Sequence, residues 1–588
     1  MSEGKLTGCP SIDKPWLKYY SDEAIHASLP EGTICSFMMS RNQDRLDAAA
    51  LNYFGRKTSY RALFQEIDRA AASLAALGVK RGDVVSICMP NMPESVIAFY
   101  AVNRIGAVAC MLNPMNSERE IEHDLSETGS KVLFLVSPCL PKLETAISRS
   151  SLSAVVLVSP ADSMPLPMRI GYRLAKERGA AHGPRCICWK KFARLGSGAV
   201  SPAGETQSPA VILHTGGTTG EPKGVLFSNL AFNSLVCEEQ FPSEYSEHYC
   251  SSIGDTLWPI VPLFYGYGLC VGIHVTLCYG MTVLLIPQPD VKKVYETVSK
   301  YRPNHIFGIP SYLEAMADEP RFHGMDLSFF KYIVTGGDSM SIDLENRIND
   351  FLAAHGASVR LVKGYGMTEM VATATLTLPN CNEVGSVGVP MSMTNLKIVE
   401  PGTENELRYN ETGEICFSSP TLMMGYYHDP AETAKIIRTH ADGQRWACSG
   451  DLGCVTENGT LYHRGRLKRI MITHYGPEHT PQKLFPDRIE NTLTAHPAVS
   501  ACAVVSLPHP EAVNVAKAYL LLQSGFSASE ALLSELQTYC AENLPAYSVP
   551  FALEFIDAFP RTKAGKVDYL ALEKMANTHA ESSIQDGK

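Results

Sequence analysis

A segment rich in glycine and threonine, HTGGTTGEPKGV (214–225), has the residue types of a phosphate-binding loop. Glycine permits positive φ and close backbone approach, and consecutive free N–H groups form a concave site for an anion. Threonine hydroxyls add donors, and a lysine adds positive charge. Pro222 stands where G-x-x-x-x-G-K-[ST] requires its second glycine, which excludes that motif. We predict a phosphate site rather than a surface turn, formed by Thr215, Gly216, Gly217, Thr218, Thr219, Gly220 and Lys223.

Seven further motifs follow this loop along the chain. They are TGGD (335–338), GYGMTE (364–369), GEICFSSPTLMMGYYHDPAET (413–433), WACSGDLG (446–453), HRGRLKR (463–469), LPAYSVP (544–550) and PRTKAGK (560–566). Together with the loop, and in this order, they resemble the signature of the adenylate-forming superfamily. That superfamily comprises acyl-CoA synthetases, the adenylation domains of nonribosomal peptide synthetases and firefly luciferase. The resemblance covers most of the chain, from about residue 30 to residue 575, and leans towards fatty acyl-CoA synthetases.

The resemblance implies that these motifs bind ATP. The loop and Lys223 would hold the phosphates, Tyr365 would offer a flat face to adenine, and Asp451 would accept hydrogen bonds from the ribose. Glu369 would bring Mg²⁺, with Thr368 beside the phosphates. Further nucleotide-binding positions implied are Gly336, Gly337, Asp338, Gly364, Gly366, Met367 and Arg466. Singly, each residue has an ordinary alternative as a turn residue or a surface charge, but the ordered set favours the functional interpretation.

The chemistry implied by the resemblance is activation of a carboxylic acid. Attack of the carboxylate on the α-phosphate of ATP gives acyl-AMP and pyrophosphate, and AMP is then a good leaving group for a thiol. The first step brings two anions together, so cations and dipoles are the catalytic need. Lys566 would bridge the carboxylate and the α-phosphate. In the family a small C-terminal domain, here 466–588, rotates against the large domain, here 1–465, about a hinge matched by Lys468.

The acyl group is predicted from the stretch PLFYGYGLC (262–270). Relatives that activate amino acids carry an aspartate after this motif, whereas this chain has Tyr265 and no acid, which disfavours an α-amino acid. Gly266 and Ile309 belong to surroundings that are apolar and partly small. These residues suit an open slot for a medium- or long-chain fatty acid, although the same residues could form ordinary core.

The thiol acceptor is predicted to be CoA, with Gly476 on the thiol side of the site. After this glycine the chain runs PEHTPQKLF before Pro486, which is longer than the family pattern. The extra residues around Pro477–Pro481 either lengthen a surface loop, which is our prediction, or reshape the thiol channel. Two other functions stay open. One is an acyl-AMP ligase that loads a separate acyl carrier protein, and the other is a nucleotide-binding homologue without catalysis.

The elements that position these motifs alternate between helical and strand patterns. Residues 59–77 place apolar side chains on one helical face, with Gly78 as a stop. Short apolar runs predict buried strands at 84–89, 131–136, 154–158, 210–214, 281–286, 305–309 and 332–336. Such strands between helices indicate an α/β fold. We predict a large N-terminal domain of parallel or mixed sheets flanked by helices, plus a small mobile α+β C-terminal domain.

Composition excludes several classes of protein. The net charge of −10 and the pI near 6.0 disfavour a nucleic-acid partner. The first thirty residues contain no apolar run, so no signal peptide is visible, and the 17 cysteines include no C-x-x-C pair. A cytoplasmic enzyme with reduced thiols is the simplest interpretation. Residues 256–289 are apolar but broken by glycines, which predicts a buried helix and strand rather than a membrane span and leaves at most peripheral membrane contact. Residues 159–206 are predicted to be a surface excursion.

Overall fold

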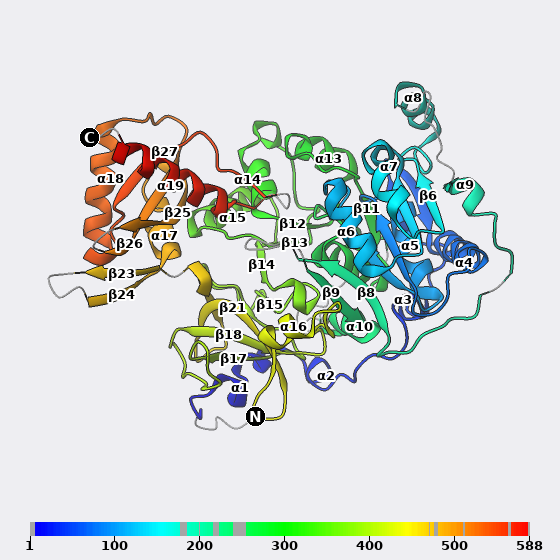
Figure 1. Ribbon diagram of the computed structural model, residues 1–588, viewed down its shortest axis with the longest axis horizontal. Helices are drawn as coiled ribbons and strands as arrows, with labels where there is room; N and C mark the ends of the chain where they lie inside the picture. The colour runs from blue at the N-terminus through cyan, green and yellow to red at the C-terminus, as the bar shows by residue number, and fades with distance from the viewer. Residues whose placement is uncertain are drawn as a thin grey trace.

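The computed structural model describes the chain except for residues 1–5, 177–184, 199, 216–222, 239–253, 470, 476–479, 510–511, 563–565 and 586–588. Figure 1 shows β-sheets with helices packed against them, and a smaller sheet with its own helices lies near the C-terminus. The predicted α/β class is confirmed, including both the mixed sheets of the large N-terminal part and the smaller sheet near the C-terminus. The boundary at residues 465 and 466 stays a prediction.

The first sheet has eight strands, and its central part is parallel. Its order is β19 (Gly425–Tyr426), β9 (Gly224–Ser228), β8 (Pro209–His214), β4 (Val108–Met111), β3 (Val84–Cys88), β5 (Val132–Val136), β6 (Ala154–Val158) and β7 (Cys186–Cys188). Alternate residues of β3 point to opposite faces, so Val85 enters one hydrophobic core and Val84 another. These two cores include residues of α4 (Tyr60–Ala76) and α5 (Pro93–Arg104) on one face, and of α6 (Glu118–Thr128) and α7 (Leu140–Arg149) on the other.

The second sheet has nine strands, and one of its faces shares the core of the first. Its order is β16 (Val389–Pro390), β15 (Thr375–Leu376), β14 (Val362–Tyr365), β13 (Tyr332–Gly336), β12 (His305–Gly308), β10 (Thr256–Pro259), β11 (Thr282–Leu285), β1 (Ala49–Tyr53) and β2 (Arg56–Ser59). Helices α3 (Ile34–Ser40) and α10 (Asn229–Glu238) pack in the shared core. The outer face is covered by α13 (Val294–Tyr301), α14 (Pro310–Asp318) and α15 (Ile342–Ala354).

The apolar segment 256–289 lies inside this part of the protein. It forms β10, a helix with π-type hydrogen bonds (η4, Tyr267–Val275), one turn of α-helix (α12, Thr276–Cys278) and β11. The side chains of η4 after Tyr267 are buried. The prediction of a buried helix followed by a buried strand is therefore confirmed. In the part of the chain that the structure describes, no helix has the length and apolar character needed to cross a bilayer.

The third sheet follows, with β17 (Asn395–Val399), β18 (Gly413–Ser418), β21 (Arg445–Val455) and β20 (Ile437–Thr439) in order, and β22 (Leu461–Arg466) paired with β21. The chain start packs here through α1 (Pro10–Asp13) and η1 (Pro15–Tyr19), and Trp16 is fully buried. Helix α2 (Asp22–Ile25) lies beside them, and α16 (Pro430–Ile436) joins β19 to β20. Arg466, the first residue of the predicted small domain, is therefore the last residue of a strand in this third sheet.

The C-terminal unit contains a three-stranded sheet of β25 (Val499–His509), β26 (Val513–Leu522) and β27 (Ala552–Phe555). Helices α17 (Pro486–Thr494) and α18 (Glu530–Asn543) contribute to one core, and α19 (Tyr569–Gln585) contributes to a second one. A two-stranded hairpin, β23 (Met471–Tyr475) with β24 (Thr480–Leu484), precedes α17. The lengthened segment after Gly476 thus continues into a β-hairpin strand, while residues 476–479 lie outside the described residues.

The predicted surface excursion at 159–206 is only partly correct. Its first half forms α8 (Leu166–Lys176), whose apolar side chains are exposed. Its second half forms β7, which pairs with β6, and α9 (Trp189–Phe192). Trp189 and Phe192 are buried against Phe134 in the shared core. Two large aromatic side chains bury enough apolar surface to hold a polar segment against the sheet edge.

Candidate active site

The predicted adenine-binding residues meet at the carboxyl ends of two neighbouring parallel strands. In the register of β13 and β14, Gly336 lies opposite Gly364, and Tyr365 is the last residue of β14. A Cβ on Gly336 would lie 2.8 Å from the carbonyl oxygen of Gly364, and one on Gly366 would lie 1.7 Å from that of Ala372. These glycines are therefore required for close packing. Ligands of open α/β sheets commonly bind at the carboxyl ends of the strands, which is where these residues lie.

Asp451, the predicted ribose contact, joins this strand end to the third sheet. The Tyr365 hydroxyl donates a hydrogen bond of 2.6 Å to Oδ2 of Asp451. Arg466 Nε lies 2.9 Å from Oδ1 as an ion pair, at an angle that does not form a hydrogen bond. Burial raises the pKa of Asp451, but the neighbouring His463 and Arg466 more than offset it, so the pKa lies below its ordinary value. The carboxylate is thus held ionised, which leaves both of its oxygens as acceptors only.

Lys566 from the C-terminal unit reaches the same place. Burial lowers the pKa of its ammonium group, while the negative charges of Asp338 and Asp451 raise it and Arg466 lowers it further. Lys566 therefore lies within electrostatic reach of three residues predicted for the nucleotide site. Its carbonyl accepts a hydrogen bond of 2.8 Å from the Thr562 amide, and Val567 beside it forms a β-bridge with Arg561. The residues between, 563–565, are outside the described part of the chain.

The phosphate loop is the tip of the antiparallel hairpin of β8 and β9. Its ends are closed by a hydrogen bond from the Thr215 amide to the Lys223 carbonyl and by one from the Lys223 amide to Thr215 Oγ1, both of 3.1 Å. The predicted residues Gly216, Gly217, Thr218, Thr219 and Gly220 lie outside the described residues.

Two site residues were missed by the sequence analysis, although both lie in the quoted motif 413–433. The ammonium group of Lys223 makes a short contact with the carboxylate of Glu432 and lies 4.9 Å from the ring centre of Tyr426. The Tyr426 hydroxyl donates a hydrogen bond of 2.6 Å to Oε1 of Glu369. Contact with Lys223, then with Lys435, lowers the pKa of Glu432 to about 2. Tyr426 therefore contacts both Lys223 and Glu369 and lies between them.

Glu369 fits the predicted magnesium contact. Thr368 and Glu369 lie in a short 3₁₀ turn directly after β14, and both are half-buried. No cluster of three metal-binding side chains occurs among the residues that the structure describes. Mg²⁺ keeps several waters and is commonly bound by one or two carboxylates plus substrate phosphates, so a single carboxylate beside a phosphate loop suits it.

The predicted acyl-binding residues border the nucleotide motif. A Cβ on Gly266 would lie 1.7 Å from the carbonyl oxygen of Val371, two residues after Glu369. Val371 has a φ of 65°, a strained conformation for a β-branched residue. Tyr265 is half-buried, with its ring 4.8 Å from that of Phe264. Ile309 is half-buried at the start of α14.

The predicted hinge residue lies between two arginines that form ion pairs with carboxylate groups. Lys468 has a described backbone in a 3₁₀ turn, and its side chain lies outside the described part. Before it, Arg466 pairs with Asp451; after it, Arg469 donates hydrogen bonds of 2.7 Å to Asp487 and 2.6 Å to Glu490. The predicted thiol-side residue, Gly476, lies outside the described residues.

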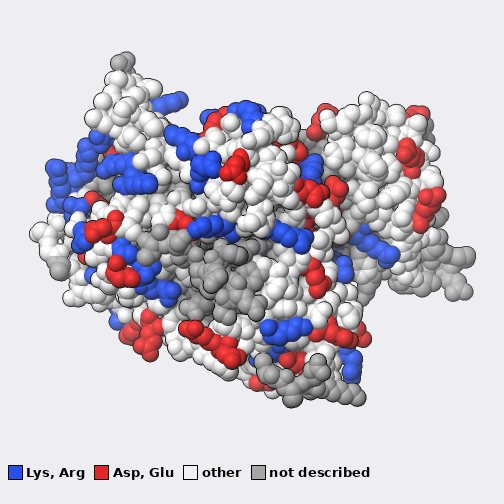
Figure 2. All heavy atoms as spheres, turned by 180° about the vertical axis from the view of Figure 1, so that it is seen from behind, with Lys and Arg blue, Asp and Glu red and all other residues white. Residues whose placement is uncertain are grey.

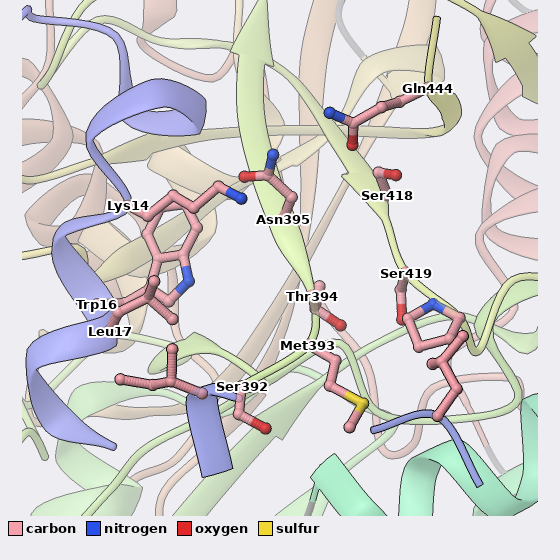
Figure 3. Close-up of a pocket in the computed structure, with 13 residues that line it drawn as sticks. Lys14, Trp16, Leu17, Ser392, Met393, Thr394, Asn395, Ser418, Ser419 and Gln444 are labelled. Carbon is pink, nitrogen blue, oxygen red and sulfur yellow. The ribbon is translucent and has the colours of Figure 1, made fainter. Parts of the chain in front are cut away.

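A separate cavity of about 550 Å³ lies between the chain start and the third sheet. Figure 3 shows Lys14, Trp16 and Leu17 on one side of it, with Asn395 and Ser418 among the residues from β17 and β18. None of the predicted site residues lines it. It is therefore distinct from the nucleotide site.

Comparison with known families decides the assignment. Residues 39–427 match the family described as "AMP-binding enzyme", and residues 488–566 match "AMP-binding enzyme C-terminal domain". The chain belongs to the AMP-binding enzyme family. The resemblance to adenylate-forming enzymes that the motifs indicate is thereby confirmed.

Relatives and solved structures of this family match over nearly the whole chain. The long-chain-fatty-acid–CoA ligase of Bacillus subtilis (strain 168) is 27% identical over 94% of this chain and 96% of its own length. A feruloyl-CoA synthase of Amycolatopsis sp is 29% identical over 88% of this chain and 94% of its own length. The structure of an anthranilate CoA ligase in complex with anthranoyl-AMP has a TM-score of 0.78 at 21% identity. The match covers 95% of this chain and 99% of that protein. ATP-bound MatB from Rhodopseudomonas palustris has a TM-score of 0.76 at 22% identity, covering 92% of this chain and 99% of its own. The two structures support the fold, and the substrates for which the relatives are named differ.

Proposed function

We propose that this protein activates a medium- or long-chain fatty acid with ATP to acyl-AMP and transfers the acyl group to CoA. The observation that carries the adenylation step is the electrostatic interaction of Lys566 with Asp338, Asp451 and Arg466. A lysine of the C-terminal unit that interacts electrostatically with the predicted ribose and adenine residues would stabilise the charge that develops on the α-phosphate and the attacking carboxylate.

The nucleotide would be bound by this chain's residues in three parts. Tyr365 and the backbone at Gly336–Asp338 would hold adenine, and Asp451 with Arg466 would hold the ribose. Thr215, Thr368 and Lys223 would contact the phosphates together with the loop 216–220. Magnesium on Glu369 would neutralise phosphate charge when bound. ATP would replace Glu432 as the partner of Lys223, because the phosphates carry more negative charge than one carboxylate.

Three observations support a fatty acid as the substrate. Tyr265 replaces an acid, so an ammonium group would have no partner at that position. The buried helix η4, which begins directly after Gly266, offers apolar surroundings. The relative in Bacillus subtilis is named for long-chain fatty acids. Hydroxycinnamates are the substrates named for other relatives, so an aromatic acid is the alternative within the same chemistry.

CoA is the proposed acceptor because the named relatives are CoA ligases. The alternative acceptor is a separate acyl carrier protein. The third possibility, a nucleotide-binding homologue without catalysis, is disfavoured because Lys566, Glu369, Asp451 and Lys223 are all retained.

The decisive experiment is an ATP–pyrophosphate exchange screen over carboxylic acids, followed by addition of CoA. We expect exchange with dodecanoate and related acids, and consumption of the acyl-AMP when CoA is added. Exchange without consumption by CoA favours the carrier protein. No exchange with any acid favours the non-catalytic alternative.

A further inference from the structure

Helix α8 is an amphipathic helix that projects from the edge of the first sheet. Figure 1 shows it standing clear of the other elements, beyond β6 and α7. Four large apolar side chains on it are exposed, at 59% for Leu166, 41% for Met168, 52% for Ile170 and 57% for Leu174. Scattered exposed apolar residues are normal, but several on one short helix are not.

The exposed side chains have a regular spacing. Leu166, Ile170 and Leu174 are four residues apart, so they form one stripe along the helix, and Arg169 and Arg173 follow along one edge of it. Contacts between α8 and the rest of the protein fix the orientation of the helix. Arg173 donates a hydrogen bond of 2.8 Å to Asp162, and Tyr172 packs against the shared core. The apolar stripe therefore faces outward while the other side of the helix is held.

The surroundings of this stripe are basic. The described residues 166–176 and 185–195 contain no acidic residue and seven basic ones: Arg169, Arg173, Lys176, Arg185, Lys190, Lys191 and Arg194. The last four are exposed on or next to β7 and α9. Figure 2 shows lysine and arginine atoms gathered beside and below the white projecting lobe. This local positive charge stands out in a chain whose net charge is −10.

We propose that α8 docks the protein on the surface of an anionic lipid bilayer. An apolar stripe edged by basic residues is the pattern of a helix that lies in the plane of the interface. The stripe would enter the boundary between headgroups and acyl chains, while Arg169 and Lys176 of α8 and the exposed basic residues on or next to β7 and α9 would face the anionic headgroups. With eleven residues, α8 is about 16 Å long, which suits lying on a bilayer and not crossing it. The proposal stands on α8 and does not depend on the identity of the acyl substrate.

Vesicle co-sedimentation of the full-length protein tests the proposal. We expect the protein to sediment with phosphatidylcholine vesicles that contain about one-third phosphatidylserine, and far less with phosphatidylcholine alone. The combined variant Leu166→Gln, Ile170→Gln and Leu174→Gln keeps helix propensity but removes the stripe, and we expect its vesicle affinity to fall more than ten-fold. The matched control replaces exposed apolar residues elsewhere, Ile12→Gln, Ile342→Gln and Phe526→Gln, and should bind as the wild type does.

A second pair of variants tests the charge. Replacing Lys190, Lys191 and Arg194 by glutamine should weaken binding about five-fold for each residue and reduce its dependence on salt. The control replaces Lys18, Lys300 and Arg360, which are exposed on other parts of the surface, and should change binding little. An Ile170→Trp variant should show a blue-shifted fluorescence increment over the wild type when anionic vesicles are added.

Three outcomes overturn the proposal. One is absence of wild-type binding to anionic vesicles, and another is equal binding by the α8 variant. The third is a loss of self-association in the α8 variant, measured by light scattering without lipid, since that makes the stripe a contact between copies of the chain. Pyrophosphate exchange by the α8 variant at the wild-type rate in detergent-free buffer shows that its fold is intact, so the loss of binding cannot be assigned to misfolding.

Discussion

The Tyr365 hydroxyl donates a 2.6 Å hydrogen bond to Asp451 and so links β14 of the second sheet to β21 of the third. The two residues are 86 positions apart in the chain. Burial, together with the adjacent negative charge of Asp451, raises the pKa of Tyr365 well above its ordinary value, so the phenol stays a donor at any working pH. The carboxylate keeps its second oxygen towards Arg466, which leaves a charged acceptor at the end of β14.

The first prediction concerns this carboxylate. Asp451→Ala should weaken ATP binding by about 1.5–3 kcal/mol, because a charged acceptor for the ribose is lost. Tyr365→Phe removes only the neutral hydroxyl and should cost about 0.5–1.5 kcal/mol. Isothermal titration with ATP measures both. Unchanged ATP affinity in Asp451→Ala, with an unaltered thermal midpoint, would contradict the ribose assignment.

The second prediction separates the two half-reactions. Lys566→Ala should lower the adenylation rate about 10²–10³-fold, because its charge is required while the carboxylate meets the α-phosphate. The same variant, supplied with synthetic acyl-AMP and CoA, should form thioester at close to the wild-type rate. An equal loss in both assays would show that Lys566 has a different role.

The third prediction concerns the pH dependence of adenylation. Burial lowers the pKa of Lys566, and the charged form is the active one, so the exchange rate should fall as pH rises through a pKa below 10.5. Asp338 raises this pKa, so in Asp338→Asn the fall of the exchange rate on the alkaline side, the alkaline limb of the pH–rate profile, should move to lower pH. Lys566→Arg should remove that limb, since a guanidinium stays charged. A limb that persists unchanged in Lys566→Arg would belong to another group.

The fourth prediction concerns acyl chain length. Burial of each further CH₂ contributes about 0.8 kcal/mol, so kcat/KM should rise roughly four-fold per carbon until the slot ends. We expect the rise to continue beyond eight carbons. A series of saturated acids in the exchange assay measures it, with acetate, benzoate and ferulate as comparisons. A preference for any of these three over dodecanoate would exclude the fatty-acid proposal while leaving adenylation intact.

The fifth prediction uses a buried carboxyl group outside the nucleotide site. Oε1 of Glu238 accepts hydrogen bonds from Thr394 at 2.9 Å and Ser419 at 3.4 Å, while burial raises its pKa to about 8. The pKa of Glu238 is therefore higher in the folded protein than its ordinary value of 4.5, which applies to the unfolded chain. The protonated group stabilises the fold fully below pH 4.5, and this stabilisation is lost as the pH rises towards 8. The slope is at most about 1.4 kcal/mol per pH unit.

Glu238→Gln should therefore remove this part of the pH dependence. The thermal midpoint of the wild type minus that of the variant should decrease between pH 5 and pH 8. Glu144→Gln, at an exposed position on α7, is the matched control and should give a difference that varies little with pH. A constant difference for Glu238→Gln as well would mean that Glu238 is ionised throughout this range.

The sequence by itself determined the family, because the residues predicted to contact nucleotide lie in short motifs whose types and order can be read locally. Short apolar runs between helical segments also predicted seven strands, since strands buried on both faces need continuous apolar segments. These strands are β3, β5, β6, β8, β11, β12 and β13. The predicted slot residue Gly266, however, meets Val371 only through the packing of η4 on the loop after β14.

Only the tertiary structure decided which side chains share a contact across long stretches of chain. Glu432 meets Lys223 over 209 residues, and Tyr426 meets Glu369 over 57, and no local periodicity encodes such pairs. The same holds for the segment 159–206, where composition alone suggested one exposed excursion. Its aromatic half packs into the core because a sheet edge lies beside it. The amphipathic half, α8, has no such neighbour among the described residues, and its apolar stripe is exposed.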